Sequence, residues 1–324
     1  MRYSASDKMD IIHTVERSHL SARQTLDKIG IPRTTFYRWY DRYLDGGFDG
    51  LEDKQPHPGK VWNRIPDTVR KQVIDLALDE PELSPRELAV RFTDAKGYFI
   101  SEASVYRMLK AADMITSPAY VVIKAADEFK DKPSRINEQW QTDFTYFKVK
   151  GWGWYYLSTI LDDYSRYVIS WKLCSTMKAK DVTDTLELAL NASGCSDKAN
   201  MPRLLSDNGA SYIAEELADY LTDKGMGHVR GAPYHPQTQG KIERWHQTLK
   251  NKILLDNYYL PSHLEHEIGQ FIEYYNHERY HESLGNLTPA DVYFGRDTAI
   301  LEKRRKIKEA TLKKRRLQHY TQAA

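Results

Sequence analysis

Residues 139–149 read QWQTDFTYFKV, and this run decides the class of fold that we expect. Aromatic and β-branched residues alternate with other residues along it, a period of two that is typical of a half-buried strand. A GWG turn at 151–153 leads into YYLSTILDD (155–163), and YSRYVISWKL (164–173) follows directly. The pattern therefore predicts an antiparallel meander of three strands.

Downstream of this meander, helical and extended segments alternate. The apolar spacing predicts helices over 178–193, 211–225, 241–257 and around 264–277. Two short runs, PRLLSDNG (202–209) and HVRGAP (228–233), read as extended segments. Strands first and helices interleaved later are typical of an α/β core with a mixed sheet flanked by helices. We place this core at 135–296.

Residues 7–44 have a helical period and predict three short helices. Ser21 is a candidate cap, Gly30 ends the second helix, and RTTFYRWYDRYL (33–44) forms the third. This order is typical of a helix-turn-helix unit, and also of a plain three-helix bundle that makes no DNA contact. In the first interpretation the groove-facing residues are Arg33, Thr34, Thr35 and Arg38, while Phe36, Trp39 and Tyr40 pack inward.

A second unit repeats the pattern at 64–117. Ser84 and Glu87 form a capping box with Pro85 at the first helical position, and 101–114 follows a turn around Gly97 as a second recognition helix. Its candidate DNA contacts are Ser104 and Arg107. Tandem units favour DNA binding, because each adds base and phosphate contacts to one site.

The helical units are bounded by segments that we interpret as linkers. Gly and Pro without a sustained period run through 45–63, and we assign 1–50 to the first unit and 51–63 to a linker. A second linker is expected at 118–134, before the core.

Composition narrows the class of protein. The 324 residues suggest about two domains, and 41% apolar with 28% charged residues is ordinary for a folded soluble protein. No apolar run approaches a membrane span, and the start carries Asp7 and Asp10 where a signal peptide would be basic and then apolar. Cys174 and Cys195 have no metal-binding spacing. We therefore expect a cytosolic protein.

Positive charge is concentrated at the C-terminal end. Residues 301–324 hold nine Lys and Arg against two Glu, a net +7, and because the whole chain is +2, residues 1–300 carry −5. We predict that 297–324 is a flexible basic tail that follows DNA phosphates, with a solvated helix as the alternative.

Three carboxylates stand out. Asp143 lies inside a predicted strand, where Asp is disfavoured and a buried carboxylate needs a partner. Asp207 precedes Asn208 and Gly209, which also fits simple turn chemistry, and Glu243 opens a helix, where it also stabilises the helix dipole. Helical spacing places Gln247 and Lys250 on the stripe of Glu243, apart from the apolar stripe of Ile242, Trp245, Leu249 and Ile253.

Asp143, Asp207 and Glu243, with 35 residues between the second and third, resemble the D,D-35-E triad of insertion-sequence transposases and retroviral integrases. Lys250 stands seven residues after the glutamate, where those proteins carry a basic residue. The flanking runs SDNG, YHPQTQGKIER, LDDYSRYVISW and YNHERYHESLGNLTPADV match as well. The resemblance covers about 135–296, and the tandem helical units look like those of bacterial single-reading-frame transposases. The viral zinc-binding domain has no counterpart, so no zinc is implied.

The resemblance implies an RNase H-like catalytic core whose first and fourth strands and one helix bring the three carboxylates together. All-oxygen ligands select Mg²⁺ or Mn²⁺, and two such ions would activate the attacking oxygen and stabilise the leaving oxygen at a DNA phosphodiester. The implied enzyme is a polynucleotidyl transferase and endonuclease that cleaves 3′ ends and transfers them to target DNA. Further DNA contacts are expected from His235, Gln237, Gln239, Lys241, Arg244 and Lys250.

The implied partners are double-stranded DNA, as element ends and target, and further copies of this chain. We expect at least a dimer, because both ends must be cut and joined, and no membrane. A DNA-binding regulator with a silent core is the alternative, against which the intact triad argues. A carboxylate-pair glycosidase would not explain two helix-turn-helix units.

Two further groups of residues favour structural roles. Asp162 and Asp163 lie in a hairpin turn. His277 and His281 are four residues apart but lack a zinc motif, so we assign them to packing or hydrogen bonding.

Overall fold

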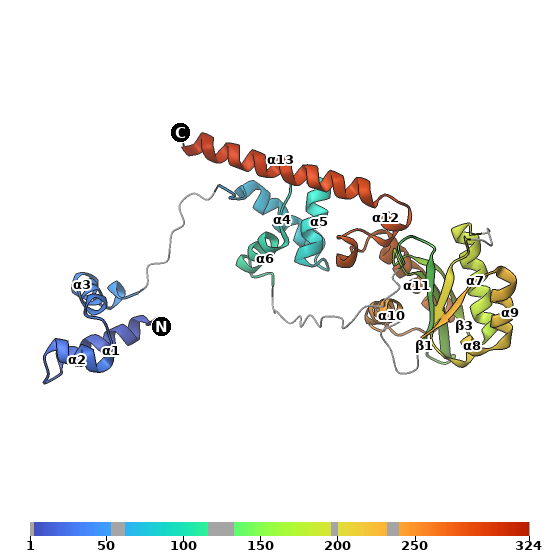
Figure 1. Cartoon of the computed structure of the whole chain (residues 1–324), viewed down its shortest axis with the longest axis horizontal. Helices are drawn as coiled ribbons and strands as arrows, with labels where there is room; N and C mark the ends of the chain where they lie inside the picture. Colours follow the sequence, from blue (N-terminus) through green and yellow to red (C-terminus); the bar gives the residue numbers. More distant parts are fainter. Residues whose placement is uncertain (1–2, 53–61, 116–132, 196–199, 232–239, 324) are drawn as a thin grey trace. The chain divides into compact units, whose positions relative to one another are not determined.

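The computed structural model describes residues 3–52, 62–115, 133–195, 200–231 and 240–323 (Figure 1). The chain divides into two compact units, Met1–Arg64 and Ile65–Ala324. The second helix-turn-helix region therefore shares a unit with the mixed-sheet core, and the first forms the other unit.

The first unit contains the three predicted helices, α1 (Ala5–Glu16), α2 (Ala22–Ile29) and α3 (Arg33–Gly50). Ser21 caps α2 through a capping box, and Gly30 ends it in the left-handed conformation at φ 75°. The core contains Ile12, Leu26, Ile31, Phe36, Trp39 and Leu51, with Tyr40 packed against it. The predicted inward face of the third helix is confirmed.

The interpretation of residues 45–50 as part of a Gly- and Pro-rich linker is wrong. Helix α3 continues to Gly50, with a kink at Gly47 (φ 60°, ψ −147°), and the side chain of Leu51 is fully buried. The Lys8 Nζ donates to the Leu51 carbonyl at 3.0 Å. One apolar side chain at the end of a Gly- and Asp-rich run is enough to hold it against the core, so Leu51 belongs to the first unit.

The second unit begins with α4 (Asp67–Asp79), α5 (Pro85–Lys96) and α6 (Glu102–Ala111). The capping box of Ser84 and Glu87 is present, and Gly97 ends α5 in the left-handed conformation at φ 59°. These helices enclose a small core of their own that includes Val73, Leu88, Phe92 and Val105. The predicted three-helix pattern is confirmed here too.

The core sheet has the strand order β3-β2-β1-β4-β5. Its strands are β1 (Gln139–Val149), β2 (Gly153–Asp162), β3 (Val168–Cys174), β4 (Arg203–Ser206) and β5 (His228–Arg230). The first three are antiparallel, as predicted, whereas β4 pairs parallel with β1 and β5 parallel with β4. The sheet is therefore mixed, and β1 lies at its centre.

Side-chain alternation along the strands divides the core into layers. Phe147, Val149, Leu157 and Leu161 pack with α10 (Gly240–Ile253) and α11 (Pro261–His277). Trp140 and Ile160, whose side chains belong to the other alternation, pack with α7 (Ala179–Ser193), α8 (Ala210–Ile213) and α9 (Glu215–Lys224). Helices thus cover both faces of the sheet (Figure 1). The single helix predicted at 211–225 is two helices, because the backbone at Ala214 is extended.

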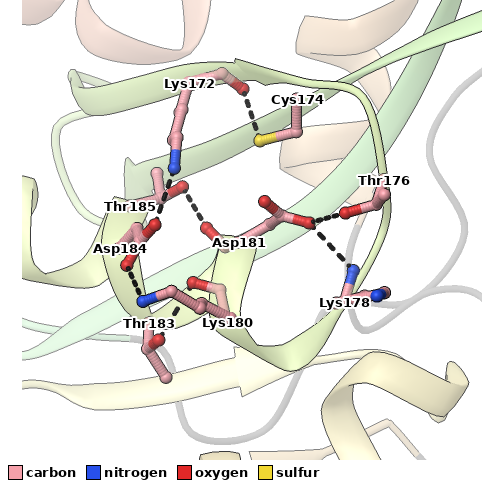
Figure 2. Close-up of polar contacts among 9 residues, drawn as sticks. All are labelled: Lys172, Cys174, Thr176, Lys178, Lys180, Asp181, Thr183, Asp184 and Thr185. Atoms are coloured by element: carbon pink, nitrogen blue, oxygen red, sulfur yellow. Dashed lines mark hydrogen bonds and ion pairs between the residues drawn. The ribbon is translucent and has the colours of Figure 1, made fainter.

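Carboxylates at the start of α7 tie this helix to β3 (Figure 2). Asp181 accepts from the Lys178 backbone at 3.0 Å and from Thr176 Oγ1. Asp184 pairs with Lys172 Nζ of β3 at 2.7 Å and with Lys180 Nζ at 3.3 Å. The helix layer on this face is therefore fixed to the sheet by polar contacts as well as by apolar packing.

The prediction of a flexible tail at 297–324 is wrong. After η3 (Glu282–Leu284) and α12 (Pro289–Tyr293), the chain forms the 27-residue helix α13 (Asp297–Ala323). Arg304 pairs with Asp94 at 2.6 Å, Thr311 Oγ1 accepts from the Phe99 backbone at 3.0 Å, and the Arg315 guanidinium donates to the Phe99 carbonyl at 2.7 Å. Several of the charges counted as a tail hold the second helix-turn-helix unit.

Along the stretches that the structure describes, every helix is too short or too polar to cross a membrane. Cys174 and Cys195 are free thiols, and burial raises the pKa of the Cys174 thiol to about 12.

Candidate active site

Asp143 projects from the middle of β1, opposite Thr159 of β2. One carboxylate oxygen accepts from the Phe144 backbone N–H at 2.8 Å, and the other lies 3.3 Å from His246 Nδ1 of α10. About a quarter of the side chain is exposed. The carboxylate is therefore held at both oxygens while remaining open to solvent.

Asp207 follows β4, the strand next to β1, in the turn that its Asn-Gly sequence predicts. Its Oδ1 accepts from the Gly209 backbone N–H at 2.8 Å. A Cβ at Gly209 would lie 3.0 Å from this oxygen, so glycine leaves room for the carboxylate. Partial desolvation raises the pKa of the Asp207 carboxyl, the hydrogen bond from the Gly209 N–H lowers it, and the charge of Asp143 raises it, so that the net shift is upward.

Glu243 lies in the first turn of α10. Partial desolvation and the charge of Asp143 raise the pKa of its carboxyl, and His246 lowers it. The buried hydroxyl of Tyr212 experiences both Asp143 and Asp207, whose charges raise its pKa further after burial. Asp143 is therefore the carboxylate that interacts with each of the other two.

The three carboxylates are candidate ligands for a divalent cation. Within the described ranges, His, Cys, Asp and Glu side chains form no group of three or more that could hold a metal ion. Mg²⁺ commonly uses one or two carboxylates and completes its shell with water and substrate phosphate oxygens. Asp143, Asp207 and Glu243 each offer carboxylate oxygens, which fits Mg²⁺ or Mn²⁺ chemically.

His246 is a residue that the sequence analysis missed. It is buried beside Asp143, and its other ring nitrogen has no hydrogen-bond partner among the described residues. Its spacing of three residues from Glu243 could have indicated a shared side of the helix. The contact with Asp143 could not have been found, because it joins a strand and a helix about a hundred residues apart.

Lys241, one of the predicted DNA contacts, is held by contacts within the chain. Its Nζ lies 2.7 Å from Asp163 Oδ1 and donates to the Asp163 carbonyl oxygen at 2.8 Å. Burial, followed by the charge of Arg166, lowers the pKa of this lysine. Lys241 therefore fastens α10 to the β2–β3 turn, and its contact with DNA stays a prediction.

The other predicted contacts on α10 differ in their surroundings. Arg244 is exposed, and Lys250 Nζ lies over the Tyr146 ring, 4.6 Å from its centre. Gln247, on the same stripe, donates to Asn251 at 2.7 Å. His235, Gln237 and Gln239 lie outside the described residues.

The candidate recognition residues lie on the third helix of each helical unit. On α3, Arg33, Thr34 and Arg38 are exposed and Thr35 is half-buried. On α6, Arg107 is exposed, and Ser104 is half-buried with its hydroxyl 2.9 Å from that of Ser101. The arginines that would read bases are therefore accessible on both helices.

Asp162 and Asp163, which the sequence assigns to structural roles, are buried and accept hydrogen bonds from neighbouring residues. Asp162 is fully buried and accepts from the backbone of Asn137 at 2.8 Å and from both donors of Ser165. Asp163 accepts from the side-chain amides of Gln139 and Gln141.

The two histidines likewise occupy packed positions. His277 meets the Tyr167 ring edge-on and His281 the Tyr275 ring. Burial lowers the pKa of His281 to about 3, so this ring is neutral at physiological pH.

Comparison with protein families assigns each region. Integrase core domain models match residues 133–236 and 224–289. Homeodomain-like domain models match residues 2–52 and 35–109. Residues 133–289 are therefore similar to integrase core domains, and the residues before them are similar to homeodomain-like domains.

Similar curated proteins include insertion-sequence transposases. The transposase of IS904 from Lactococcus lactis subsp. lactis is 28% identical over 164 residues, 49% of this chain and 62% of the relative. The putative transposase InsK of IS150 from Escherichia coli is 30% identical over 161 residues, 49% of this chain and 56% of the relative. The Gag-Pro-Pol polyprotein of human T-cell leukemia virus 3 is 32% identical over 129 residues, 39% of this chain and 8% of the polyprotein. The matches span between half and two thirds of these transposases.

Similar solved structures include retroviral integrases. The HTLV-2 integrase catalytic core domain in complex with magnesium is 22% identical, with a TM-score of 0.40, and covers 49% of this chain and 98% of that one. A simian T-cell lymphotropic virus intasome chain is 20% identical, with a TM-score of 0.45, and covers 68% of this chain and 74% of that one.

Proposed function

We propose that this protein is a DNA transposase that binds the ends of an insertion element, cleaves their 3′ ends and transfers them into target DNA. The observation that carries the proposal is that the charge of Asp143 raises the pKa of both the Asp207 and the Glu243 carboxyls, and that Asp207 follows the strand that pairs with the strand of Asp143. The helix-turn-helix domains of the same chain would bind the DNA and bring it to these carboxylates. The curated transposase relatives support the same assignment.

In this proposal Asp143, Asp207 and Glu243 would hold two Mg²⁺ or Mn²⁺ ions. The two ions would supply charge stabilisation to the attacking and leaving oxygens of an in-line displacement. His246 and the Phe144 N–H fix the two oxygens of Asp143, and the Gly209 N–H fixes Asp207. The nucleophiles are water in the cleavage step and the freed 3′-hydroxyl in the transfer step, so no side chain has to attack.

DNA would be recognised by α3 and α6, with Arg33, Arg38 and Arg107 exposed for contact. Exposed Arg244 and the half-exposed Lys250 lie on the same helix as Glu243 and would contact phosphates near the cleaved bond. Because two element ends must be cut and joined together, we propose that the active species is a homo-oligomer on DNA, at least a dimer.

The proposal is tested by replacing each carboxylate with its amide, in Asp143→Asn, Asp207→Asn and Glu243→Gln. Each change keeps the side-chain shape and removes a negative charge needed to retain the metals. Replacing residues that only support metal ligands typically costs 10–100-fold, so we expect cleavage to fall by more than about 100-fold. Binding to the end sequence should be nearly unchanged. Mg²⁺-dependent nicking of end-sequence DNA and binding isotherms measure the two properties.

The matched control is Asp219→Asn, which removes an exposed carboxylate of α9 in the same domain and should leave cleavage unchanged. A triad variant that cleaves at the wild-type rate would remove that residue from the active site. If wild-type protein binds end DNA but does not cleave it in Mg²⁺ or Mn²⁺, the regulator with a silent core is the better description.

A further inference from the structure

A pocket of about 440 Å³ lies beside α10, on a different stripe of that helix from Glu243. From α10 it receives Lys241, Arg244, Trp245 and Thr248, which follow one another at helical spacing. The remaining walls come from the β2–β3 turn, from α5, from α11 and from the segment that follows it. They contribute Arg86, Arg166, Tyr275, Arg279, Tyr280, His281, Glu282 and Ser283.

The walls of this pocket are strongly basic. Four arginines and one lysine line it, against the single carboxylate of Glu282. Lys241 is paired with Asp163 and Arg86 donates to Asn286, but Arg166, Arg244 and Arg279 make no ion pair with any described residue. The guanidinium charges of these three act together on the buried Tyr275 hydroxyl, each lowering its pKa against the larger effect of burial.

The surroundings of Arg166 show that placing these cations together without an anion costs free energy. It is half-buried, its backbone is in the left-handed region at φ 66°, and desolvation lowers the pKa of its guanidinium. The Arg166 Nε, Trp245 Nε1 and His281 Nε2 are buried and find no hydrogen-bond partner among the described residues. Converging cations and unpartnered buried donors are costly, and a bound anion would offset the repulsion.

We propose that this pocket binds a backbone phosphate of duplex DNA. Guanidinium groups bind phosphate oxygens through two parallel hydrogen bonds, so a cluster of arginines favours this anion. Arg244 adjoins Glu243 in sequence, and successive phosphates of one strand are about 3.4 Å apart along the helix axis. Arg244 lies about 100° around α10 from Glu243, between Glu243 and the rest of the pocket. A duplex that crosses the exposed side of α10 at Glu243 would therefore present further phosphates to Arg244 and to the pocket beyond it. This inference rests on the proposed function and assigns it a second DNA contact.

The test uses the full chain and a 30-base-pair duplex of scrambled sequence, because a backbone contact is independent of sequence. The variant Arg244→Gln/Arg279→Gln removes two unpaired charges from the pocket. Removing one phosphate interaction reduces the slope of log affinity against log salt by about 0.9, so the decrease in affinity from 50 to 200 mM salt should be about 3.5-fold smaller for each interaction removed. Binding isotherms over a salt series measure the slope.

Two variants separate charge recognition from damage to the fold. Arg244→Lys/Arg279→Lys keeps both charges and should recover most of the slope. Lys180→Gln removes one charge from α7, on the opposite face of the sheet, and leaves Asp184 paired with Lys172, so its slope should be that of the wild type. Thermal unfolding of all variants verifies that each is folded.

An unchanged slope in a folded Arg244→Gln/Arg279→Gln protein would overturn the inference. So would a reduction seen only on duplexes carrying a 5′-phosphate, which would assign the pocket to a strand end instead of the backbone. If the wild-type protein binds DNA but does not cleave it, the proposed function fails while the phosphate site can still hold. If the wild-type protein cleaves DNA but the salt slopes of the wild type and of Arg244→Gln/Arg279→Gln agree, the phosphate site alone fails.

Discussion

The two helix-turn-helix units have the same local design and different surroundings. In each, a serine capping box opens the second helix, with Ser21 in one and Ser84 in the other. In each, a left-handed glycine ends that helix, and an accessible arginine lies on the third. Short-range sequence therefore specifies both modules equally well.

What distinguishes them is the partner of the second unit. The first encloses its own core, closed by Leu51, whereas Asp94, Tyr98 and Phe99 of the second are bonded to Arg304, Thr311 and Arg315 of α13. Arg86 of the second unit also bonds Asn286, close after η3. The same local pattern gives a self-contained domain in one place and a component of a larger unit in the other.

The largest expected effect comes from Arg304→Ala. Arg304 forms a forked pair with Asp94 and donates to the Asn286 carbonyl at 2.8 Å, with 15% of its side chain exposed. Removing one partner of a mostly buried pair leaves Asp94 uncompensated, which should cost about 2–4 kcal/mol in the free energy of unfolding of the second unit. Urea denaturation of the full chain measures it.

The neighbouring Arg305 provides the control. It pairs only with the exposed Glu302 and Glu309 on its own helix, so Arg305→Ala should leave stability almost unchanged. Equal changes in the free energy of unfolding for the two variants would show that the Arg304 contacts of α13 do not stabilise the second helix-turn-helix unit.

A smaller effect, of about 1–3 kcal/mol in binding, is expected from Arg38→Ala and from Arg107→Ala. If each arginine reads a base, each change should relax preference for the end sequence over scrambled DNA. Because the modules read separate bases, the two effects should add in the double variant. Parallel isotherms on the two DNAs measure the preference, and an equal decrease on both would reassign that arginine to phosphate.

The smallest effect is expected from Gly30→Ala and Gly97→Ala. Both glycines have positive φ, and a Cβ at either would meet no described atom within 4 Å, so backbone strain alone should cost about 1–2 kcal/mol in each. Hydrogen exchange should show the destabilisation confined to the first helix-turn-helix unit for Gly30→Ala and centred on the second helix-turn-helix unit for Gly97→Ala.

Gly46 gives the contrasting control, since it is helical and open to substitution, and Gly46→Ala should be neutral or stabilising. A destabilisation from Gly30→Ala that extended into the second unit would contradict the independence of the first.

Sequence patterns predicted the helical units, the strand meander and the mixed core. Capping boxes, left-handed glycines and strand alternation depend on neighbours a few residues away, so their signals are local. The acidic triad remains a prediction that substitution tests, although the structure shows Asp143 interacting with both other carboxylates. Composition failed at 45–50 and at 297–324, where Leu51 and Arg304 respectively join segments to distant surfaces.

The sequence by itself determined the identity and order of the elements and the three carboxylates available for chemistry, because residue type and spacing set both. Only the tertiary structure decided that Lys241 pairs with Asp163, that His246 holds Asp143 and that three arginines converge on one pocket. These contacts join residues as much as about a hundred positions apart. The strength of these charge interactions depends on burial and on the neighbours that folding brings together, and no local sequence pattern predicts either of them.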